Sequence, residues 1–310
     1  MARIPKGPAA WTRRHLLGIR DLSRGELDAV LALARKLKKS PPATPLLKGR
    51  RLLTFFVEAS TRTKTSFGIA ARRLGAEVVD VSPGGSSLAK GESLKDTART
   101  IDSMGVDFAV VRHPASGAPL HISKAVGSSV VNAGDGANEH PTQALLDLFT
   151  MEQRLGRSTG LRVALVGDIL HSRVARSNLW AHRLLGNEVT VVGPATLIPR
   201  GIEALGAAVT HDLDPVLGTH DVIMMLRLQL ERQQAGLFPS TAEYARLYGL
   251  TRERLANLKK GAIVMHPGPM NRGWEISSEA ADGGASVIQD QVANGVFVRM
   301  AVLLLLGGAR

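Results

Sequence analysis

Four consecutive polar residues, Ser60-Thr61-Arg62-Thr63, are the group in this sequence best suited to chemistry. They follow an apolar run at 52–57, which predicts a buried strand, and they open a helix-period segment that ends near Leu74. A strand that turns directly into a helix presents backbone N–H groups and the positive end of the helix dipole. With hydroxyls and a guanidinium beside them, these groups predict an anion site best suited to phosphate. The simpler alternative is that Ser60 only caps the helix and Arg62 is solvated.

More polar residues fall directly after other predicted strands. In the first half of the chain they are Ser87, Lys90, Arg112, His140 and Gln143, and in the second half Arg173, Arg227, Gln229 and Arg232. Ligands of open α/β sheets bind beyond the carboxyl ends of the strands. The sequence therefore predicts that nearly all of these side chains lie on the ligand-binding side.

The residue types limit the chemistry. No carboxylate pair, metal-spaced histidine cluster or Gly-x-Ser-x-Gly elbow occurs. His140 and Gln143 share the first turn of a predicted helix, where a histidine tends to stay neutral and to donate a hydrogen bond to a carbonyl oxygen. Arginine side chains bind carboxylates in a forked geometry. We infer a reaction that joins a phosphorylated carbonyl donor to a carboxylate-bearing acceptor, with phosphate leaving. Taken singly, His140 is better interpreted as a structural cap and each arginine as an ordinary surface residue.

The elements that must position these residues alternate between strand and helix. The predicted strands lie at 51–57, 76–81, 107–112, 129–132, 162–168, 188–192, 222–226 and 262–265. The predicted helices cover 23–39, the segment that ends at 73–75, 92–104, the segment that starts near 140, 172–185 and 291–306. Such alternation predicts an α/β fold of two doubly wound domains with parallel sheets. We place the first domain at 1–150 and the second at 151–290.

Composition excludes several classes of protein. The 310 residues are 44% hydrophobic and 21% charged, as in globular proteins, and they include no cysteine for disulfides or thiolate chemistry. The longest apolar run, at 300–306, is too short to span a bilayer, so we expect a cytoplasmic protein without membrane insertion. The net charge of +12 raises nucleic acid as a partner, but the basic residues are scattered and aromatics are only 4%. A cationic surface also attracts small anionic substrates.

The motifs together resemble the catalytic chains of the aspartate carbamoyltransferase family, in family order over about residues 13–306. The matching segments are Phe56-Val57-Glu58-Ala59-Ser60-Thr61-Arg62-Thr63, Val111-Arg112-His113-Pro114, Asn132-Ala133-Gly134-Asp135-Gly136, His140-Pro141-Thr142-Gln143-Ala144-Leu145-Leu146-Asp147, Leu226-Arg227-Leu228-Gln229-Leu230-Glu231-Arg232 and His266-Pro267-Gly268-Pro269.

This resemblance implies transfer of the carbamoyl group from carbamoyl phosphate to the amine of L-aspartate, without a cofactor or metal. It also implies a C-terminal helix at 291–310 that returns to the first domain. The residues that it assigns to carbamoyl phosphate are Ser60, Thr61, Arg62, Thr63, Arg112, His140, Gln143 and the backbone carbonyls of Gly268 and Pro269. Of these, Arg62, Thr63, Arg112 and His140 are the catalytic group.

The resemblance assigns the aspartate site to Lys90, Arg173, Arg227 and Gln229. Ser87 and Lys90 resemble residues that reach into the site of a neighbouring subunit, which implies a homotrimer with shared active sites. Glu58 resembles a residue that pairs with second-domain arginines such as Arg173 and Arg232 when the domains close.

Some features depart from the family pattern or leave alternatives open. Gly268 stands where some members have Leu, Lys64 stands where Arg is common, and the loop at 87–90 is one residue shorter than in some relatives. Whether regulatory chains or a dihydroorotase partner bind stays open. The nearest alternative is an ornithine or other amino-acid carbamoyltransferase, but 226–232 offers two arginines to an acidic acceptor. A non-catalytic relative or nucleic-acid binder is the alternative from a different class.

Overall fold

The computed structural model describes residues 11–81, 92–229, 237 and 240–308. The chain divides into two compact units. Unit 1 comprises Met1–Leu146 and Val292–Arg310, and unit 2 comprises Asp147–Gln291. The C-terminal segment belongs to unit 1, so the chain enters and leaves unit 2 once each.

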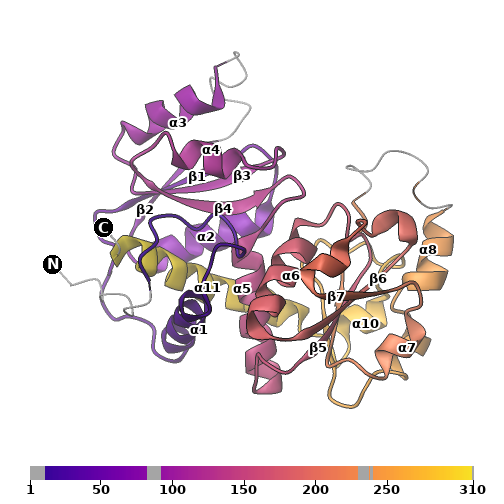
Figure 1. Cartoon of the computed structure of the whole chain (residues 1–310). Coiled ribbons are helices and arrows are strands. Elements are labelled where there is room, and N and C mark those ends of the chain that lie inside the picture. The colour runs from indigo at the N-terminus through magenta and orange to yellow at the C-terminus, as the bar shows by residue number, and fades with distance from the viewer. Residues whose placement is uncertain (1–10, 82–91, 230–236, 238–239, 309–310) are drawn as a thin grey trace. The chain divides into compact units, whose positions relative to one another are not determined.

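Unit 1 is built around a parallel sheet in the order β2-β1-β3-β4. Its strands are β1 (Arg51–Phe56), β2 (Glu77–Val81), β3 (Phe108–His113) and β4 (Ser129–Asp135). Its helices are α1 (Arg24–Lys39), α2 (Thr61–Arg73), α3 (Leu94–Asp102) and α4 (Ala118–Ser123), with parts of α5 (Pro141–Leu155) and α11 (Ile288–Gly308). Figure 1 shows α3 and α4 on one side of the sheet and α2 and α11 on the other. This is the predicted doubly wound arrangement.

Unit 2 holds a five-stranded parallel sheet in the order β7-β6-β5-β8-β9. Its strands are β5 (Arg162–Val166), β6 (Glu188–Val192), β7 (Ala207–Thr210), β8 (Val222–Met225) and β9 (Ile263–Met265). Its helices are α6 (Arg173–Leu185), α7 (Asp214–Leu217), α8 (Thr241–Tyr248), α9 (Arg252–Leu255) and α10 (Ser278–Asp282), with the short 3-10 turns η3 (Ala195–Leu197) and η4 (Ile202–Leu205). The predicted class, two α/β domains with parallel sheets, is confirmed.

Strand order reverses once in each sheet. In unit 1, β1 lies between β2, which follows it in the chain, and β3, which comes later still. In unit 2, β5 likewise lies between β6 and β8. Because crossover connections are right-handed, the helices on either side of such a reversal cover opposite faces of the sheet. In open α/β sheets the ligand-binding crevice lies at such a reversal, which here means the carboxyl ends of β1 and β3 and those of β5 and β8.

Side chains at the start of helix α1 stabilise the helix, which covers the predicted segment. Ser23 is the N-cap, its hydroxyl accepts from the backbone N–H of Glu26, and the Glu26 side chain accepts from the backbone of Ser23. This capping box satisfies two of the otherwise unpaired N–H groups at the helix start. Leu27, Val30 and Leu31 are buried on one face.

Ser60 gives a different result at the start of α2. It occupies the N-cap position with extended backbone, but its side chain makes no capping hydrogen bond to the described residues. Ser60 therefore takes the expected N-cap position without a side-chain capping hydrogen bond.

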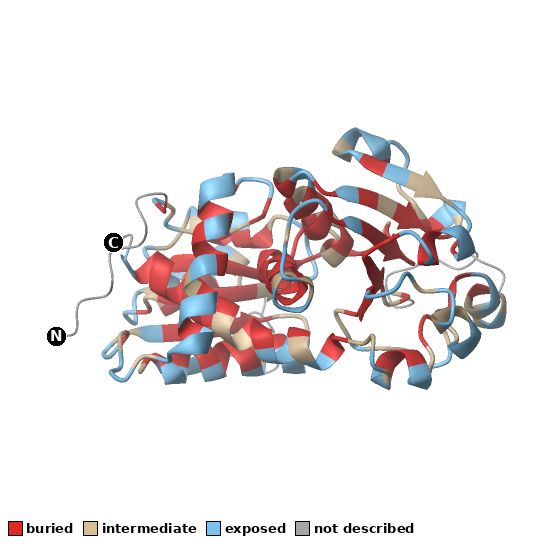
Figure 2. Cartoon of the chain, turned by 90° about the horizontal axis from the view of Figure 1, so that it is seen from below, coloured by how far each residue is buried: buried red, intermediate tan, exposed pale blue. Residues whose placement is uncertain are grey.

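Helix α11 is long and largely apolar. By length and composition it passes the test for a membrane-spanning helix, with a mean hydropathy of 1.5. However, 72% of its apolar 18-residue stretch is buried inside the protein. Figure 2 marks the buried residues of the helices and strands in red. Packing on most sides accounts for its composition without a membrane. It begins at Ile288, three residues before the predicted start at 291. Ile288 and Gln291 are both buried, so this first turn is also packed against the rest of the protein.

Other differences concern short elements. Strand β7 falls in a stretch where the sequence analysis had placed no strand, because its exposed edge residues lack a continuous apolar run. Strand β4 continues to Asp135, beyond the predicted end at 132. Leu16 forms a parallel bridge beside β4, so this edge strand is covered and fully buried.

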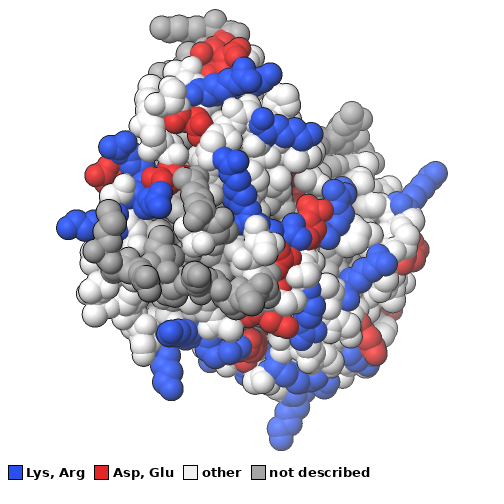
Figure 3. Space-filling model, turned by 60° about the vertical axis from the view of Figure 1, so that its left-hand side comes forward, with Lys and Arg blue, Asp and Glu red and all other residues white. Residues whose placement is uncertain are grey.

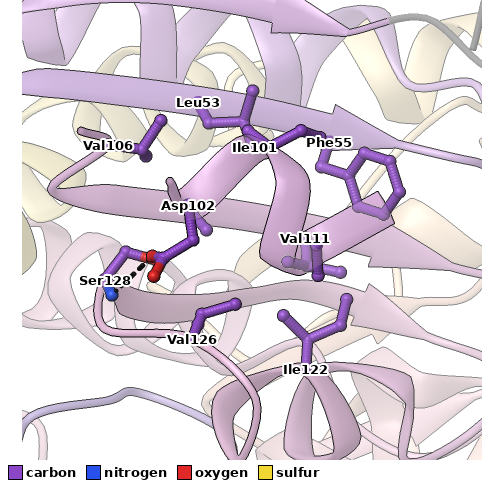
Figure 4. A pocket seen from close by; sticks show the side chains of 11 residues that line it. Leu53, Phe55, Ile101, Asp102, Val106, Val111, Ile122, Val126 and Ser128 are labelled. Atoms are coloured by element: carbon purple, nitrogen blue, oxygen red, sulfur yellow. Dashed lines mark hydrogen bonds between the residues drawn. The ribbon is translucent and has the colours of Figure 1, made fainter. Parts of the chain in front are cut away.

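A small apolar cavity lies between the unit 1 sheet and helices α3 and α4 (Figure 4). Leu53 and Phe55 of β1 and Ile101 of α3 point toward it. The one carboxylate at its edge, Asp102, accepts hydrogen bonds from the backbone N–H groups of Gly127 at 2.7 Å and Ser128 at 2.9 Å. Its charge is therefore engaged with the loop before β4, and the cavity belongs to the core.

We expect acid to destabilise unit 2 through His182. Burial lowers the pKa of His182 from 6.5 to about 4. Between these values the unfolded chain binds a proton that the folded chain does not, so the free energy of unfolding falls as the pH drops, by at most about 1.4 kcal/mol per pH unit. His182→Gln should reduce this dependence. Urea unfolding of both proteins at pH 7 and pH 5 measures it, and equal pH dependence in the two proteins would contradict the prediction.

Candidate active site

The predicted phosphate group lies at the corner between β1 and α2. Thr61, Arg62 and Thr63 form the first turn of α2, and Ser60 precedes it. Thr61 and Arg62 are exposed, whereas Thr63 is buried. Strand β1 is one of the two strands at the reversal in unit 1, so this helix start lies at the crevice.

Arg112 comes from β3, the other strand at this reversal. Its Nη2 atom donates to Oε1 of Glu58 at 2.6 Å, and Nη1 lies 3.5 Å from the carbonyl oxygen of Ala133. Glu58 belongs to the loop that follows β1, and Ala133 belongs to β4 itself. The guanidinium is thus held at the carboxyl edge by a carboxylate of its own unit. Glu58 pairs within unit 1 in this structure, and its predicted pairing with Arg173 or Arg232 stays a prediction.

His140 immediately precedes α5 and is buried. Its Nε2 atom lies 3.5 Å from Oγ1 of Thr63, so the structure brings these two predicted residues together. Gln143 lies in the first turn of α5 and is also buried.

Asp135 shapes the loop that leads to His140. Its carboxylate accepts from the backbone N–H of Gly117 at 2.6 Å, the side-chain amide of Asn132 at 2.7 Å and the backbone N–H of Glu139 at 3.1 Å. Gly136 has a φ of +48° and its Cα faces Ser116 so closely that a Cβ would lie 2.4 Å from Oγ. The Asn-Ala-Gly-Asp-Gly motif therefore builds the loop that sets the position of His140.

In unit 2 the corresponding reversal lies between β5 and β8. Arg173 is the first residue of α6, which follows β5, and it is buried. Ser172 caps this helix by accepting from the backbone N–H of Ala175 at 3.1 Å. Arg227 and Gln229 follow β8 directly. The three predicted aspartate ligands that are described thus lie after the two strands at the reversal.

Asp168 links these two strands and was not predicted as a site residue. Its buried carboxylate accepts from the backbone N–H of Gln229 at 3.3 Å and lies 2.9 Å from Nδ1 of His171. Gly167, before it, has a φ of +129°, and a Cβ there would lie 2.9 Å from the carbonyl oxygen of Leu226. His171 was also missed, since a lone histidine after a strand carries no periodic signal.

Gly268 and Pro269 lie in the loop after β9. Nδ1 of His266 accepts from the backbone N–H of Gly268 at 2.8 Å, and Nε2 of His266 lies 3.3 Å from Oε1 of Glu275. His266 and Glu275 are both buried. The His-Pro-Gly-Pro motif pointed to His266, but nothing in the sequence pointed to Glu275.

Three predicted residues, Ser87, Lys90 and Arg232, lie outside the described residues. Within the part of the chain that the structure describes, no group of three or more His, Asp or Glu is placed to hold a metal ion. On the face in Figure 3, Lys and Arg are scattered among Asp and Glu and form no continuous basic surface.

The fold and these groups define a class: a two-domain α/β protein with residues predicted to bind anions at the strand-order reversal of both sheets. Residues 14–153 match the family model "Aspartate/ornithine carbamoyltransferase, carbamoyl-P binding domain", and residues 159–306 match the Asp/Orn binding domain of the same family. The chain belongs to the aspartate/ornithine carbamoyltransferase family.

Individual relatives agree. The aspartate carbamoyltransferase catalytic subunit of Salinispora tropica is 57% identical, over 95% of this chain and 98% of the relative. That of Pelotomaculum thermopropionicum is 53% identical, over 95% and 97%. A crystal structure of aspartate transcarbamoylase from Trypanosoma cruzi with carbamoyl phosphate and aspartate has a TM-score of 0.88 and 32% identity, over 97% of this chain and 99% of that one.

We expect Asp135→Ala to destabilise unit 1 by about 3 kcal/mol, because several buried donors lose their acceptor together. The matched control is Asp28→Ala in α1, whose carboxylate is exposed and pairs only with Arg24 among the contacts described. Its cost should stay below about 1 kcal/mol. Urea unfolding measures both variants. Equal costs would show that the Asp135 hydrogen bonds do not hold the loop.

Proposed function

We propose that this chain transfers the carbamoyl group of carbamoyl phosphate to the amine of L-aspartate, giving N-carbamoyl-L-aspartate and phosphate. The observation that carries the proposal is the position of Ser60 to Thr63 beside the reversal of the unit 1 sheet and of Arg173 and Arg227 beside the reversal of the unit 2 sheet. Two chain-long relatives named aspartate carbamoyltransferase support the choice of acceptor.

The donor is bound by unit 1. Ser60, Thr61, Arg62 and Thr63 hold the phosphate with the first N–H groups of α2, whose dipole favours an anion. Thr63, Arg112 and His140 donate to the carbonyl oxygen, which gains negative charge as the reaction proceeds. Gln143 holds the carbamoyl amide. The 3.5 Å spacing of Thr63 and His140 supports their joint action on one oxygen.

The acceptor is bound by unit 2. Arg173 and Arg227 each offer a forked guanidinium, so two carboxylates of one substrate can be held. Gln229 adds an amide, and its backbone is tied to Asp168. The carbonyls of Gly268 and Pro269 accept from the donor amide and the attacking amine.

The reaction needs no side-chain nucleophile. The aspartate nitrogen attacks the carbamoyl carbon and forms a C–N bond, and the tetrahedral intermediate then loses phosphate as its C–O bond breaks. The departing phosphate takes the proton from the amine. Most of the rate comes from holding the reactants together and from donors already oriented toward the growing oxyanion.

The active protein in this proposal is a cytoplasmic homotrimer in pyrimidine biosynthesis. Ser87 and Lys90 enter a neighbouring subunit's site, where Lys90 also contacts aspartate. Glu58 exchanges Arg112 for Arg173 and Arg232 when the units close on the substrates. The family resemblance supports these statements. The ion pair between Glu58 and Arg112 is the arrangement from which this exchange would begin.

Arg62→Ala should lower kcat/KM for carbamoyl phosphate by at least about a hundredfold, because a charge-assisted phosphate contact is lost. Arg24→Ala, an exposed arginine of α1 that pairs with Asp28, is the matched control and should keep full activity. Steady-state assays over a range of carbamoyl phosphate concentrations give both values. Near-full turnover of Arg62→Ala at low carbamoyl phosphate would remove Arg62 from the phosphate site.

The acceptor is tested with carbamoyl phosphate and either L-aspartate or L-ornithine, by measuring the carbamoylated product. We expect product from aspartate alone, since ornithine has one carboxylate and an extra cation beside Arg173 and Arg227. Product from ornithine alone would overturn the proposed function.

A further inference from the structure

We propose that His266 and Glu275 are positioning residues that hold the turn at Gly268 and Pro269 in its working geometry; this inference rests on the proposed function. Both side chains are buried, and neither contributes an atom to the predicted substrate contacts.

The hydrogen bonds of His266 define its protonation pattern. Its Nδ1 atom accepts from the backbone N–H of Gly268 at 2.8 Å, so that nitrogen carries no proton. The imidazole proton is then on Nε2, which faces Oε1 of Glu275 at 3.3 Å. Glu275 thereby selects the tautomer that leaves Nδ1 able to accept from Gly268.

Glu275 also holds the other end of the turn. Its Oε1 atom accepts from the backbone N–H of Asn271 at 2.5 Å. The two side chains therefore accept hydrogen bonds from one backbone N–H before Pro269, that of Gly268, and from one after it, that of Asn271. Because the predicted ligands in this turn are backbone carbonyls, their directions depend on the backbone path between Gly268 and Asn271.

A buried polar chain anchors the pair. The backbone N–H of His266 donates to Oε1 of Gln291 at 3.0 Å, and Nε2 of Gln291 donates to Oδ1 of Asp147 at 2.8 Å. Oδ2 of Asp147 accepts from Nδ2 of Asn178 at 2.9 Å. Asn178 lies on α6, the helix that begins with Arg173. This series of hydrogen bonds thus connects the turn to helix α6, which carries the predicted aspartate ligand Arg173.

Stability alone is a weak reason for such a pair. Burying ionisable groups costs free energy that apolar side chains of similar volume would avoid. The physical gain is orientation: a displacement of about 1 Å in a group that holds a reactant can cost about a hundredfold in rate. A positioning role predicts that kcat falls more than binding or stability does.

Two substitutions at His266 separate its contacts. His266→Asn places an oxygen near the Nδ1 position and keeps an acceptor for Gly268, whereas His266→Gln places an amide near Nε2 and loses that acceptor. We expect kcat to fall at least about tenfold in His266→Gln and less than about fivefold in His266→Asn. The KM for each substrate should change less than about threefold.

Glu275 offers a conservative rescue. Glu275→Gln keeps an oxygen for Asn271, and the other carboxylate oxygen, Oε2, has no hydrogen-bond partner among the described residues. Its kcat should stay within about threefold of the parent value, whereas Glu275→Leu should lose at least about tenfold. His182→Gln is the matched control: this buried histidine lies on α6 and bonds to Asn187 instead of the turn, so its loss should lower stability without lowering kcat at 25 °C.

Hydrogen exchange gives a readout that does not depend on activity. The amides of Gly268 and Asn271 should be protected in the parent protein and should exchange faster in His266→Gln and Glu275→Leu, but not in His182→Gln. Unchanged exchange together with unchanged kcat would overturn the inference. So would losses of kcat that simply follow the unfolding midpoint in every variant, the control included. An inactive parent protein would overturn the proposed function, while the exchange experiment would still decide whether the pair holds the turn.

Discussion

The site depends on one constraint, the reversal of strand order in each parallel sheet. A right-handed crossover from β1 to β2 and one toward β3 must place their helices on opposite faces. The edge above the reversal is then left uncovered, and the free N–H groups of the next helix point into it. The same geometry recurs between β5 and β8. The positions of Ser60 to Thr63, Arg112, Arg173, Arg227 and Gln229 follow from these two points of the fold, whereas His140 and Gln143 come after the edge strand β4, and Gly268 and Pro269 after β9.

Carboxylates bridge both reversals. Glu58, after β1, holds Arg112 of β3, and Asp168, after β5, holds the backbone of Gln229 beyond β8. In each case a carboxylate in the loop after one strand orients a predicted ligand-binding residue that belongs to the neighbouring strand or to the segment after it. Charge-assisted hydrogen bonds of this kind are stronger than neutral ones and hold a polar group in place before a ligand arrives. The two units thus solve the same positioning problem with the same chemistry.

Catalysis without a nucleophile places its demand on rigidity. The donors to the oxyanion must be oriented beforehand, since reorientation during the reaction would cost free energy. Buried polar groups with satisfied hydrogen bonds provide such rigidity. Asp135 does so for the loop before His140, and the His266–Glu275 pair does so for the turn at Gly268.

The sequence by itself determined the fold class, the two parallel sheets and the residues from Ser60 to Thr63, because apolar runs and helix starts are local signals. The same holds for the positions of Arg112, at the end of β3, and of His140, Arg173 and Arg227, which lie in the segments beyond β4, β5 and β8. Only the tertiary structure decided that Glu58 pairs with Arg112, that Thr63 lies beside His140 and that Glu275 lies beside His266. These contacts join residues that lie 9 to 77 positions apart in the sequence. No local pattern predicts which strands become neighbours, so no local pattern predicts these contacts. Their hydrogen bonds arise only when the sheets assemble.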